Sequence, residues 1–459
     1  MARDVSDQTP IESRDALVGW IAAGEKPEAD FRLGTEHEKF PFYRADLAPV
    51  PYEGRAGHGG IHALLEGMRQ KTGWEPIEDA GAIIGLFDPA GGGAISLEPG
   101  GQFELSGAPL ETVHQTACEL DLHLEQVKSV AAPHDIGFLG LGMSPIWTLA
   151  QTPIMPKSRY KIMTRYMPTV GARGLDMMYR TCTVQVNLDF GTEADMVKKL
   201  RVCLALQPLG TALFANSPFT EGRPNGRLSE RSEIWRDTDN NRAGMLPFAF
   251  EAGMGYERYV DYALQVPMYF VKRGETYHDV AGADFRALLA GRLPHLPGER
   301  ATMSDWANHL STIFPEVRLK RFLEMRGGDV GGRDHIVAFS AFFVGLIYDQ
   351  TSLDAAWDLV KDWSAAERQQ LRDDAPARGL DAEIAGVSLR EIAKQALAIS
   401  RHGLARRDRR DDKGQTEAVH LDLLDARVAS GRVAAQEWLD RFHGAWDGKV
   451  DPVFSEAAF

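Results

Sequence analysis

The sequence predicts an α+β protein in which a sheet with one polar face precedes a mainly helical C-terminal part. Residues 180–190 alternate without a break between polar and apolar side chains, which indicates a strand with one buried face. Residues 94–109 contain two shorter alternating runs on either side of a Pro-Gly-Gly turn. From about residue 350 onward, charged segments rich in Ala and Leu favour helices. No linker divides the chain, so we expect one domain over 1–459, with about 350–459 mainly helical.

The composition narrows the functional class. The chain has 459 residues, of which 44% are hydrophobic, and 51 Lys and Arg oppose 65 Asp and Glu to give a net charge of −14. Proteins that bind phosphate backbones usually carry a basic face, so we expect no nucleic-acid partner. The longest apolar stretch, 336–348, is too short to cross a bilayer, so we expect no membrane partner.

The start of the chain and its cysteines predict a cytoplasmic location. The first fifteen residues contain acids and no apolar segment, so a secretory signal is not expected. Cys118, Cys182 and Cys203 form no C-x-x-C motif, and we expect reduced thiols.

The first elements are a helix over 11–24, where apolar residues recur at helical spacing, and a strand over 31–43. Alternation along this strand puts Glu36 and Glu38 on one face, about 6.6 Å apart. Two carboxylates at that spacing can bind a hard cation, or they can be surface acids matched by neighbouring Lys or Arg.

The next strands form a hairpin over 94–109. In its second strand Gln102 and Glu104 share the polar face, Phe103 and Leu105 share the apolar face, and Glu98 precedes the turn. A solvated sheet face would show the same pattern, so the hairpin alone does not identify a site.

Two later strands carry further polar residues. The polar face of 180–190 offers amides and hydroxyls, Gln185 among them, which can orient a ligand without adding charge. In the strand over 321–329, Glu324 and Arg326 share a face. Arg326 can pair with Glu324 or hold a phosphate through two hydrogen bonds.

If these strands are neighbours, one sheet face collects the carboxylates of Glu36, Glu38, Glu104 and Glu324. Like charges do not gather there unless cations lie between them, so we expect oxygen-bound Mg²⁺ or Mn²⁺.

Candidate anion-binding residues lie in two basic segments. Residues 227–247 have loop-like composition, and within them Arg231 and Trp235 are four apart and would share a face of a helical turn. A charged surface loop is the alternative. Residues 155–168 form a second basic cluster that includes Arg159.

Other nucleotide and metal motifs are absent from the sequence. It contains no P-loop ending in G-K-[ST], no G-x-G-x-x-G that opens a βαβ unit, and no H-E-x-x-H.

Five blocks of sequence resemble the plant and proteobacterial glutamate–cysteine ligases: GTEHEKF (34–40), RTCTVQVNLDF (180–190), LFANSPFTEGRPNG (213–226), RSEIWRDTD (231–239) and FPEVRLKRFLEMRGGD (314–329). The resemblance extends from about residue 10 to the end. It implies a glutamine-synthetase-like core with a curved, six-stranded antiparallel sheet, whose bowl holds the active site. It also implies ligation of the γ-carboxylate of L-glutamate to the amine of L-cysteine, with ATP, through a γ-glutamyl phosphate in glutathione biosynthesis.

The resemblance also implies roles for individual residues. Metal ligands would be Glu36, Glu38, Glu104 and Glu324, with Gln185 beside them. Arg231 and Trp235 would hold glutamate, Arg159 would contact an anion, and Arg231 or Arg326 would stabilise the transferred phosphoryl group. Glu98 and Tyr269 would lie on the cysteine side. The partners would be these small molecules, in a monomer or weak homodimer.

Plant members carry regulatory disulfides at positions that correspond here to Val280 with His295 and Ala117 with Val337. We therefore expect no such thiol switch.

Three alternatives stay open at this point. A related carboxylate–amine ligase would use another amino acid or amine as acceptor. A guanidino kinase or a glutamine synthetase would share the acidic sheet, and an inactive relative would only bind ligands.

Overall fold

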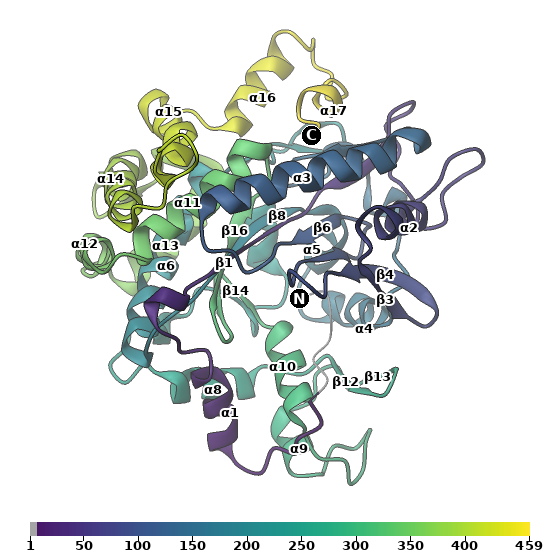
Figure 1. Cartoon of the computed structure of the whole chain (residues 1–459), viewed down its shortest axis with the longest axis vertical. Coiled ribbons are helices and arrows are strands. Elements are labelled where there is room, and N and C mark those ends of the chain that lie inside the picture. The colour runs from purple at the N-terminus through teal and green to yellow at the C-terminus, as the bar shows by residue number, and fades with distance from the viewer. Residues whose placement is uncertain (1–6) are drawn as a thin grey trace.

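A computed structural model describes residues 7–459, and at its centre lies an eight-stranded antiparallel sheet (Figure 1). The strand order is β15-β16-β8-β1-β6-β5-β4-β3. In chain order these strands are β1 (Leu33–His37), β3 (Glu75–Asp79), β4 (Ala82–Phe87), β5 (Ala94–Leu97), β6 (Phe103–Ser106), β8 (Thr183–Leu188), β15 (Val317–Leu319) and β16 (Leu323–Asp329).

The remaining strands pair two by two outside this sheet. They are β2 (Phe40–Tyr43) with β7 (Ile136–Leu139), β9 (Phe219–Thr220) with β10 (Arg223–Pro224), β11 (Ala243–Gly244) with β14 (Phe314–Pro315), β12 (Phe270–Arg273) with β13 (Thr276–Asp279), and β17 (Glu383–Ile384) with β18 (Val387–Ser388).

The first 350 residues contain the following α-helices. They are α1 (Arg14–Ala22), α2 (Ile61–Thr72), α3 (Val113–Ala131), α4 (Ser158–Tyr166), α5 (Gly174–Arg180), α6 (Glu193–Leu213), α7 (Glu230–Ile234), α8 (Tyr256–Gln265), α9 (Phe285–Leu289), α10 (Met303–Ser311) and α11 (Arg333–Ile347).

The chain after residue 350 is mainly helical, with only the short β17 and β18 between its helices. These helices are α12 (Gln350–Val360), α13 (Ala365–Arg378), α14 (Leu389–Arg407), α15 (Asp422–Ser430), α16 (Ala434–His443) and α17 (Val453–Glu456). Among residues 7–459 no single helix is long and apolar enough to cross a membrane; α11 and α12 would be so only together, and the chain bends by 92° between them.

The strands predicted from alternation are present. The 180–190 pattern corresponds to β8, the 321–329 pattern to β16, and the 94–109 pattern to the β5–β6 hairpin. Gly101 in the hairpin turn has φ +87°, a conformation that favours glycine. The strand predicted over 31–43 is divided, because β1 ends at His37 and β2 pairs with β7 instead.

The predicted count of six strands is wrong, since the sheet has eight. The β3–β4 hairpin extends it beyond β5, and its turn has positive φ at Ala80 and Gly81. Most β3 side chains are exposed or half-buried, so no apolar alternation marked this strand in the sequence. The curvature predicted for the sheet stays a prediction.

Helices α3, α6 and α11 cover the face opposite to the glutamates. The Thr35 hydroxyl of β1 is hydrogen-bonded to Ser340 of α11 at 2.7 Å, and the His37 ring lies edge-on to His123 of α3, 5.7 Å between centroids. Thr211 of α6 donates to the carbonyl of Gly327 in β16. Since β1 is buried on both faces, Glu36 faces a cavity rather than open solvent.

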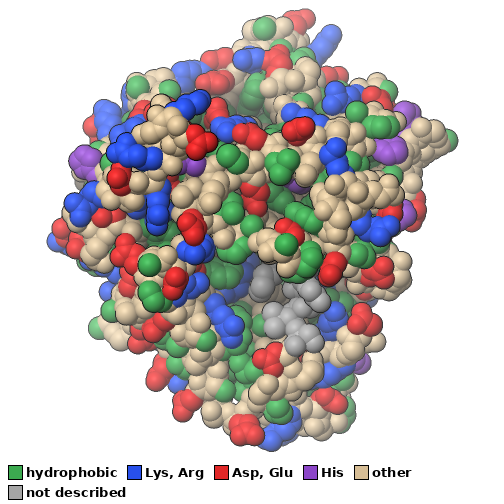
Figure 2. Space-filling view, in the orientation of Figure 1, with side chains coloured by type: hydrophobic (Ala, Val, Ile, Leu, Met, Phe, Trp, Pro, Cys, Tyr) green, Lys and Arg blue, Asp and Glu red, His purple; other side chains and the backbone are tan. Residues whose placement is uncertain are grey.

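On the molecular face shown in Figure 2, acidic and basic side chains are interspersed, with no broad region of one sign.

Candidate active site

Four glutamates line one cavity of about 120 Å³ on the polar face of the sheet: Glu36, Glu38, Glu98 and Glu104. Strand pairing brings them together. Glu36 lies opposite Gln185 of β8 on one side and Ser106 of β6 on the other, two residues from Glu104. The neighbouring strands assumed in the sequence prediction are therefore present.

Hydrogen bonds fix three of these carboxylates. Glu36 accepts from the Asn187 amide at 2.6 Å, and Glu38 accepts from the backbone N–H of Thr183 at 2.8 Å. The Ser96 hydroxyl donates to Glu104. Each carboxylate is thus held in place by an uncharged donor, which adds no positive charge to the cavity.

Burial and mutual repulsion change the pKa values of these carboxyl groups. Burial, together with the Glu98 and Glu104 carboxylates, holds the pKa of Glu38 well above its usual range. Burial, together with Glu36 and Glu98, raises the pKa of Glu104 to about 8. Without a bound cation, Glu38 and Glu104 therefore retain protons near neutral pH, and a cation that binds to them would displace these protons.

Glu324 lies beside this cavity, in an ion-pair cluster of the β15–β16 hairpin, and two of its partners, Arg318 and Arg326, line the cavity. Its carboxylate is 2.7 Å from Arg318 and 2.8 Å from Lys320, and it also pairs with Arg326. Although burial opposes ionisation, these three cations hold the pKa of Glu324 well below its usual value. Glu324 does not line the acidic cavity.

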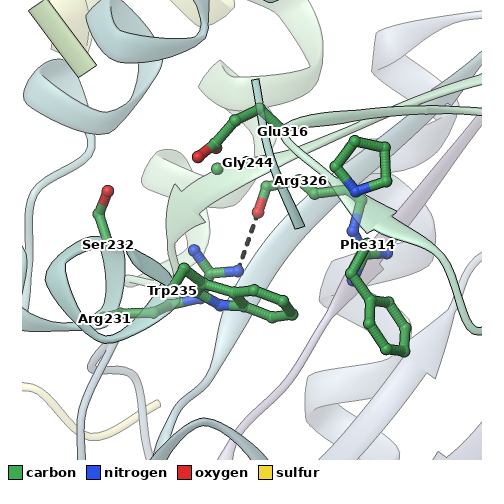
Figure 3. A pocket seen from close by; sticks show the side chains of 9 residues that line it. Arg231, Ser232, Trp235, Gly244, Phe314, Glu316 and Arg326 are labelled. Carbon is green, nitrogen blue, oxygen red and sulfur yellow. Dashed lines mark hydrogen bonds between the residues drawn. The ribbon is translucent and has the colours of Figure 1, made fainter. Parts of the chain in front are cut away.

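Two arginines line a second pocket beside the first. Arg231, Trp235, Phe314, Glu316 and Arg326 are among its lining residues (Figure 3). Arg326 lines the acidic cavity as well. Arg326 donates to Gln185 at 2.6 Å, while Arg231 donates to the Arg326 carbonyl at 2.9 Å.

Two hydrogen-bond donors in this pocket, one from Arg231 and one from Trp235, have no protein partner and can bind a ligand. Arg231 is 3% exposed, and within the described part of the chain it forms no ion pair. The Nε of Arg231 and the Nε1 of Trp235 are both buried without a hydrogen-bond partner in residues 7–459. A buried cation with unused donors calls for an anion.

A β-bulge in β16 directs Arg326. The pairing of β16 with β8 shifts between Met325 and Gly328, so Arg326 and Gly327 lie outside the regular ladder. The Arg326 carbonyl is then available to Thr183 and Arg231. A Cβ on Gly327 would lie 2.0 Å from Nε2 of the buried Gln207 in α6, so a larger residue would require the Gln207 side chain to move.

Other predicted residues separate into two groups. Arg159 lines the acidic cavity, 5.5 Å above the Tyr160 ring. Tyr269 is buried away from both cavities, with its ring 3.6 Å from the Arg242 guanidinium. Arg242 is itself paired with Asp239 at 2.6 Å and serves the structure rather than a ligand.

Sequence reasoning missed several residues of the site. Tyr160 lines the acidic cavity and donates to the Leu97 carbonyl at 2.8 Å, and Phe314 lines both cavities. Arg318 also lines the acidic cavity. The six-residue separation of Arg318 and Glu324 across a short turn could have indicated a cross-strand ion pair.

Comparison with known proteins identifies relatives. The model of Glutamate-cysteine ligase family 2 (GCS2) matches residues 32–456. The chloroplastic glutamate–cysteine ligase of Nicotiana tabacum is 52% identical over 98% of this chain and 83% of that protein. Ligase B of Oryza sativa subsp. japonica is 51% identical over 98% of this chain and 88% of that protein.

A solved structure shows the same fold at low identity. The glutamate–cysteine ligase of Francisella tularensis, solved in complex with AMP, matches with a TM-score of 0.54 and 12% identity. The match covers 94% of this chain and 88% of that chain.

The plant relatives contradict the cytoplasmic location predicted from the start of the chain, because they are chloroplastic. That prediction is wrong, since it rested on the lack of an apolar secretory segment. Organelle transit peptides are amphipathic and need no such segment.

We predict that Gly327→Ala destabilises the fold by about 1–3 kcal/mol, because the new methyl group overlaps Gln207. The measurement is urea unfolding. Gln207→Ala in the same chain should recover part of the loss. Gly19→Ala, whose Cβ would meet nothing within 4 Å, is the control. Equal midpoints for Gly327→Ala and the unmodified protein would contradict the packing account.

Proposed function

The chain belongs to glutamate–cysteine ligase family 2, and we propose that it joins the γ-carboxylate of L-glutamate to the amine of L-cysteine with consumption of ATP, the first step of glutathione synthesis. One arrangement carries the proposal: a cavity lined by four glutamates adjoins a pocket lined by two arginines, and Arg326 lines both. The first suits cations with a polyphosphate, and the second suits an anionic amino acid.

Arg231 and Trp235 anchor glutamate in this proposal. The two guanidinium groups of Arg231 and Arg326 line one pocket and repel each other, so a bound carboxylate stabilises both. Trp235 adds its unused indole N–H. The substrate's γ-carboxylate would then extend past Arg326 toward the acidic cavity.

The residues present fit a divalent cation. Within residues 7–459 no three His, Cys, Asp or Glu side chains are close enough to hold an ion by themselves. Mg²⁺ needs no such cage, because it is usually bound by one or two carboxylates together with water and substrate phosphates. When bound, it would neutralise phosphate charge during transfer.

The proposed ligands are Glu36, Glu38 and Glu104, with Glu98 beside them, and Mn²⁺ would fit the same oxygens. Glu324 is a proposed ligand under one condition. Arg318, Lys320 and Arg326 already neutralise it, so one of its oxygens must be released from them first. We expect its contribution to metal affinity to be smaller than that of Glu38.

The reaction needs two steps, because a free carboxylate does not acylate an amine at neutral pH. The γ-carboxylate attacks the terminal phosphorus of ATP, which forms an acyl phosphate and releases ADP. Arg326, held by Gln185 at the junction of the two cavities, stabilises the charge on the transferred group. The cysteine amine then attacks the acyl carbon, and inorganic phosphate leaves.

Tyr269 has no direct part in this proposal, because it faces neither cavity. The apolar wall next to Glu98 contains Met163 and Met178 instead, and it offers a surface for the acceptor.

ADP release tests the ligase activity and its acceptor. With glutamate, Mg²⁺ and ATP present, we expect ADP to form in step with added cysteine and not with ammonia or a guanidine. Another amino acid that replaced cysteine at equal efficiency would favour the related carboxylate–amine ligase. Release of many ADP molecules per enzyme without any acceptor amine would contradict ligation, whereas a single release is the first step of the proposed reaction.

Replacing Arg231 tests glutamate anchoring. We predict that Arg231→Ala raises the glutamate KM about 10- to 100-fold, the value of a hydrogen bond to a charged group. Steady-state kinetics at varied glutamate measures this. Arg236→Ala is the matched control, because Arg236 lies in the same segment but pairs with Glu233 and Asp373. An unchanged glutamate KM for Arg231→Ala would rule out its role.

Replacing Glu38 tests the metal site. We expect Glu38→Gln to raise the Mg²⁺ concentration for half-maximal activity at least about tenfold, because one charged oxygen ligand is lost. Glu119→Gln is the control, since Glu119 is a largely buried carboxyl of α3 that bonds the Ala108 N–H away from the cavity. Equal Mg²⁺ dependence for Glu38→Gln and the unmodified protein would remove Glu38 from the ligand set.

A further inference from the structure

We propose that Asp329 is the positioning residue of Arg231: its buried carboxylate fixes the short helix α7 against the end of β16. The inference rests on the proposed role of Arg231 as the glutamate anchor. Asp329 is the last residue of β16 and is completely buried.

Three donors converge on the Asp329 carboxylate. Oδ2 accepts from the backbone N–H of Asn216 at 2.8 Å and from the Ser217 hydroxyl at 2.6 Å. Oδ1 accepts from the Ser229 hydroxyl at 2.9 Å. Acceptance of hydrogen bonds on both oxygens favours the ionised carboxylate. The Arg231 cation and these donors oppose the effect of burial, which raises the pKa of Asp329 above its usual value.

Two of these donors lead directly to Arg231. The Ser217 oxygen that donates to Asp329 also accepts from the backbone N–H of Arg231 at 3.2 Å. Ser229 is the N-cap of α7, and its oxygen accepts from the N–H of Ser232. Because α7 has only five residues, it is not stable alone, and these contacts determine its orientation.

Strand β16 therefore holds Arg231 at both ends. Asp329 fixes its backbone through Ser217, and the carbonyl of Arg326, three residues earlier, accepts from its guanidinium at 2.9 Å. The bulge at Arg326 and Gly327 sets the distance between these two points.

The Asp329 carboxylate also stabilises the positive charge of Arg231 without using the guanidinium N–H groups that would bind the substrate. Burial lowers the pKa of the Arg231 guanidinium, and the Asp329 carboxylate is the strongest opposing influence. In the described residues the two side chains form no direct ion pair. A direct pair would compete with the substrate carboxylate, whereas a carboxylate behind the serines stabilises the cation and leaves its donors free.

The test compares Asp329→Asn with Ser217→Ala. Asparagine keeps the shape and can still bond to both serines, but it removes the charge. We expect Asp329→Asn to raise the glutamate KM about tenfold, as for a lost charged hydrogen bond, while the ATP and cysteine KM values and kcat change less than about twofold. Ser217→Ala keeps the charge but cuts the link to the Arg231 backbone, and should raise the glutamate KM about threefold.

Asp189→Asn is the matched control. Asp189 is a buried carboxylate directly after β8, at the opposite end of the sheet, and it pairs with Lys26. Its substitution should leave the glutamate KM unchanged. Thermal unfolding of each variant shows whether it is folded, and if Asp329→Asn does not fold, Ser217→Ala alone decides.

The two hypotheses fail in different ways. If Arg231→Ala leaves the glutamate KM unchanged, the anchoring role fails and this inference fails with it. If Arg231→Ala raises that KM but Asp329→Asn and Ser217→Ala do not, only the inference is overturned. An equal rise in all three KM values would also overturn it, since a general structural defect would produce that result.

Discussion

The structure depends on the burial of charged side chains in two adjoining cavities. Four carboxylates line one cavity together with Arg159, Arg318 and Arg326, while Arg231 and Arg326 line the next together with Glu316. Burial makes each unpaired charge costly, so the protein must fix these side chains by its fold and leave the compensation to ligands. Antiparallel pairing of β6, β1, β8 and β16 does this, because it aligns their polar side chains on one face while α3, α6 and α11 cover the other.

Arg326 connects the two cavities. Its side chain bonds to Gln185 and Glu324, and its carbonyl accepts from Arg231. At the bulge that frees this carbonyl, Gly327 packs against the Gln207 side chain without room for a Cβ unless that side chain moves. Arg326 and Gly327 in β16 thus link the phosphate side of the proposed reaction to the glutamate side. Asp329, at the end of the same strand, fixes the backbone of Arg231 through Ser217.

Local sequence patterns predicted the strands well and their assembly poorly. Unbroken alternation identified β8, and the Pro-Gly-Gly turn identified the β5–β6 hairpin, because both patterns are set by neighbouring residues. Strand order, the division of β1 from β2 and the eight-strand count arise from pairings between distant segments, which one sequence does not encode locally. Glu324 shows the same limit: its alternation was correct, but its three cationic partners depend on the β15–β16 turn. The assignment of Tyr269 came from resemblance; its ring packs on the Arg242 guanidinium, and Tyr269 lines neither cavity.

Proton release on Mg²⁺ binding tests the central account most directly. Burial and neighbouring carboxylates raise the pKa of Glu104 to about 8 and that of Glu38 well above its usual range, so at pH 7 these two side chains hold protons that a cation must displace. Calorimetric titration in buffers of different ionisation enthalpy measures the number of protons released per Mg²⁺ bound. We expect net proton release at pH 7, which declines as the pH rises past about 8 and the acids ionise beforehand. Binding of Mg²⁺ without proton release at pH 7 would contradict the account.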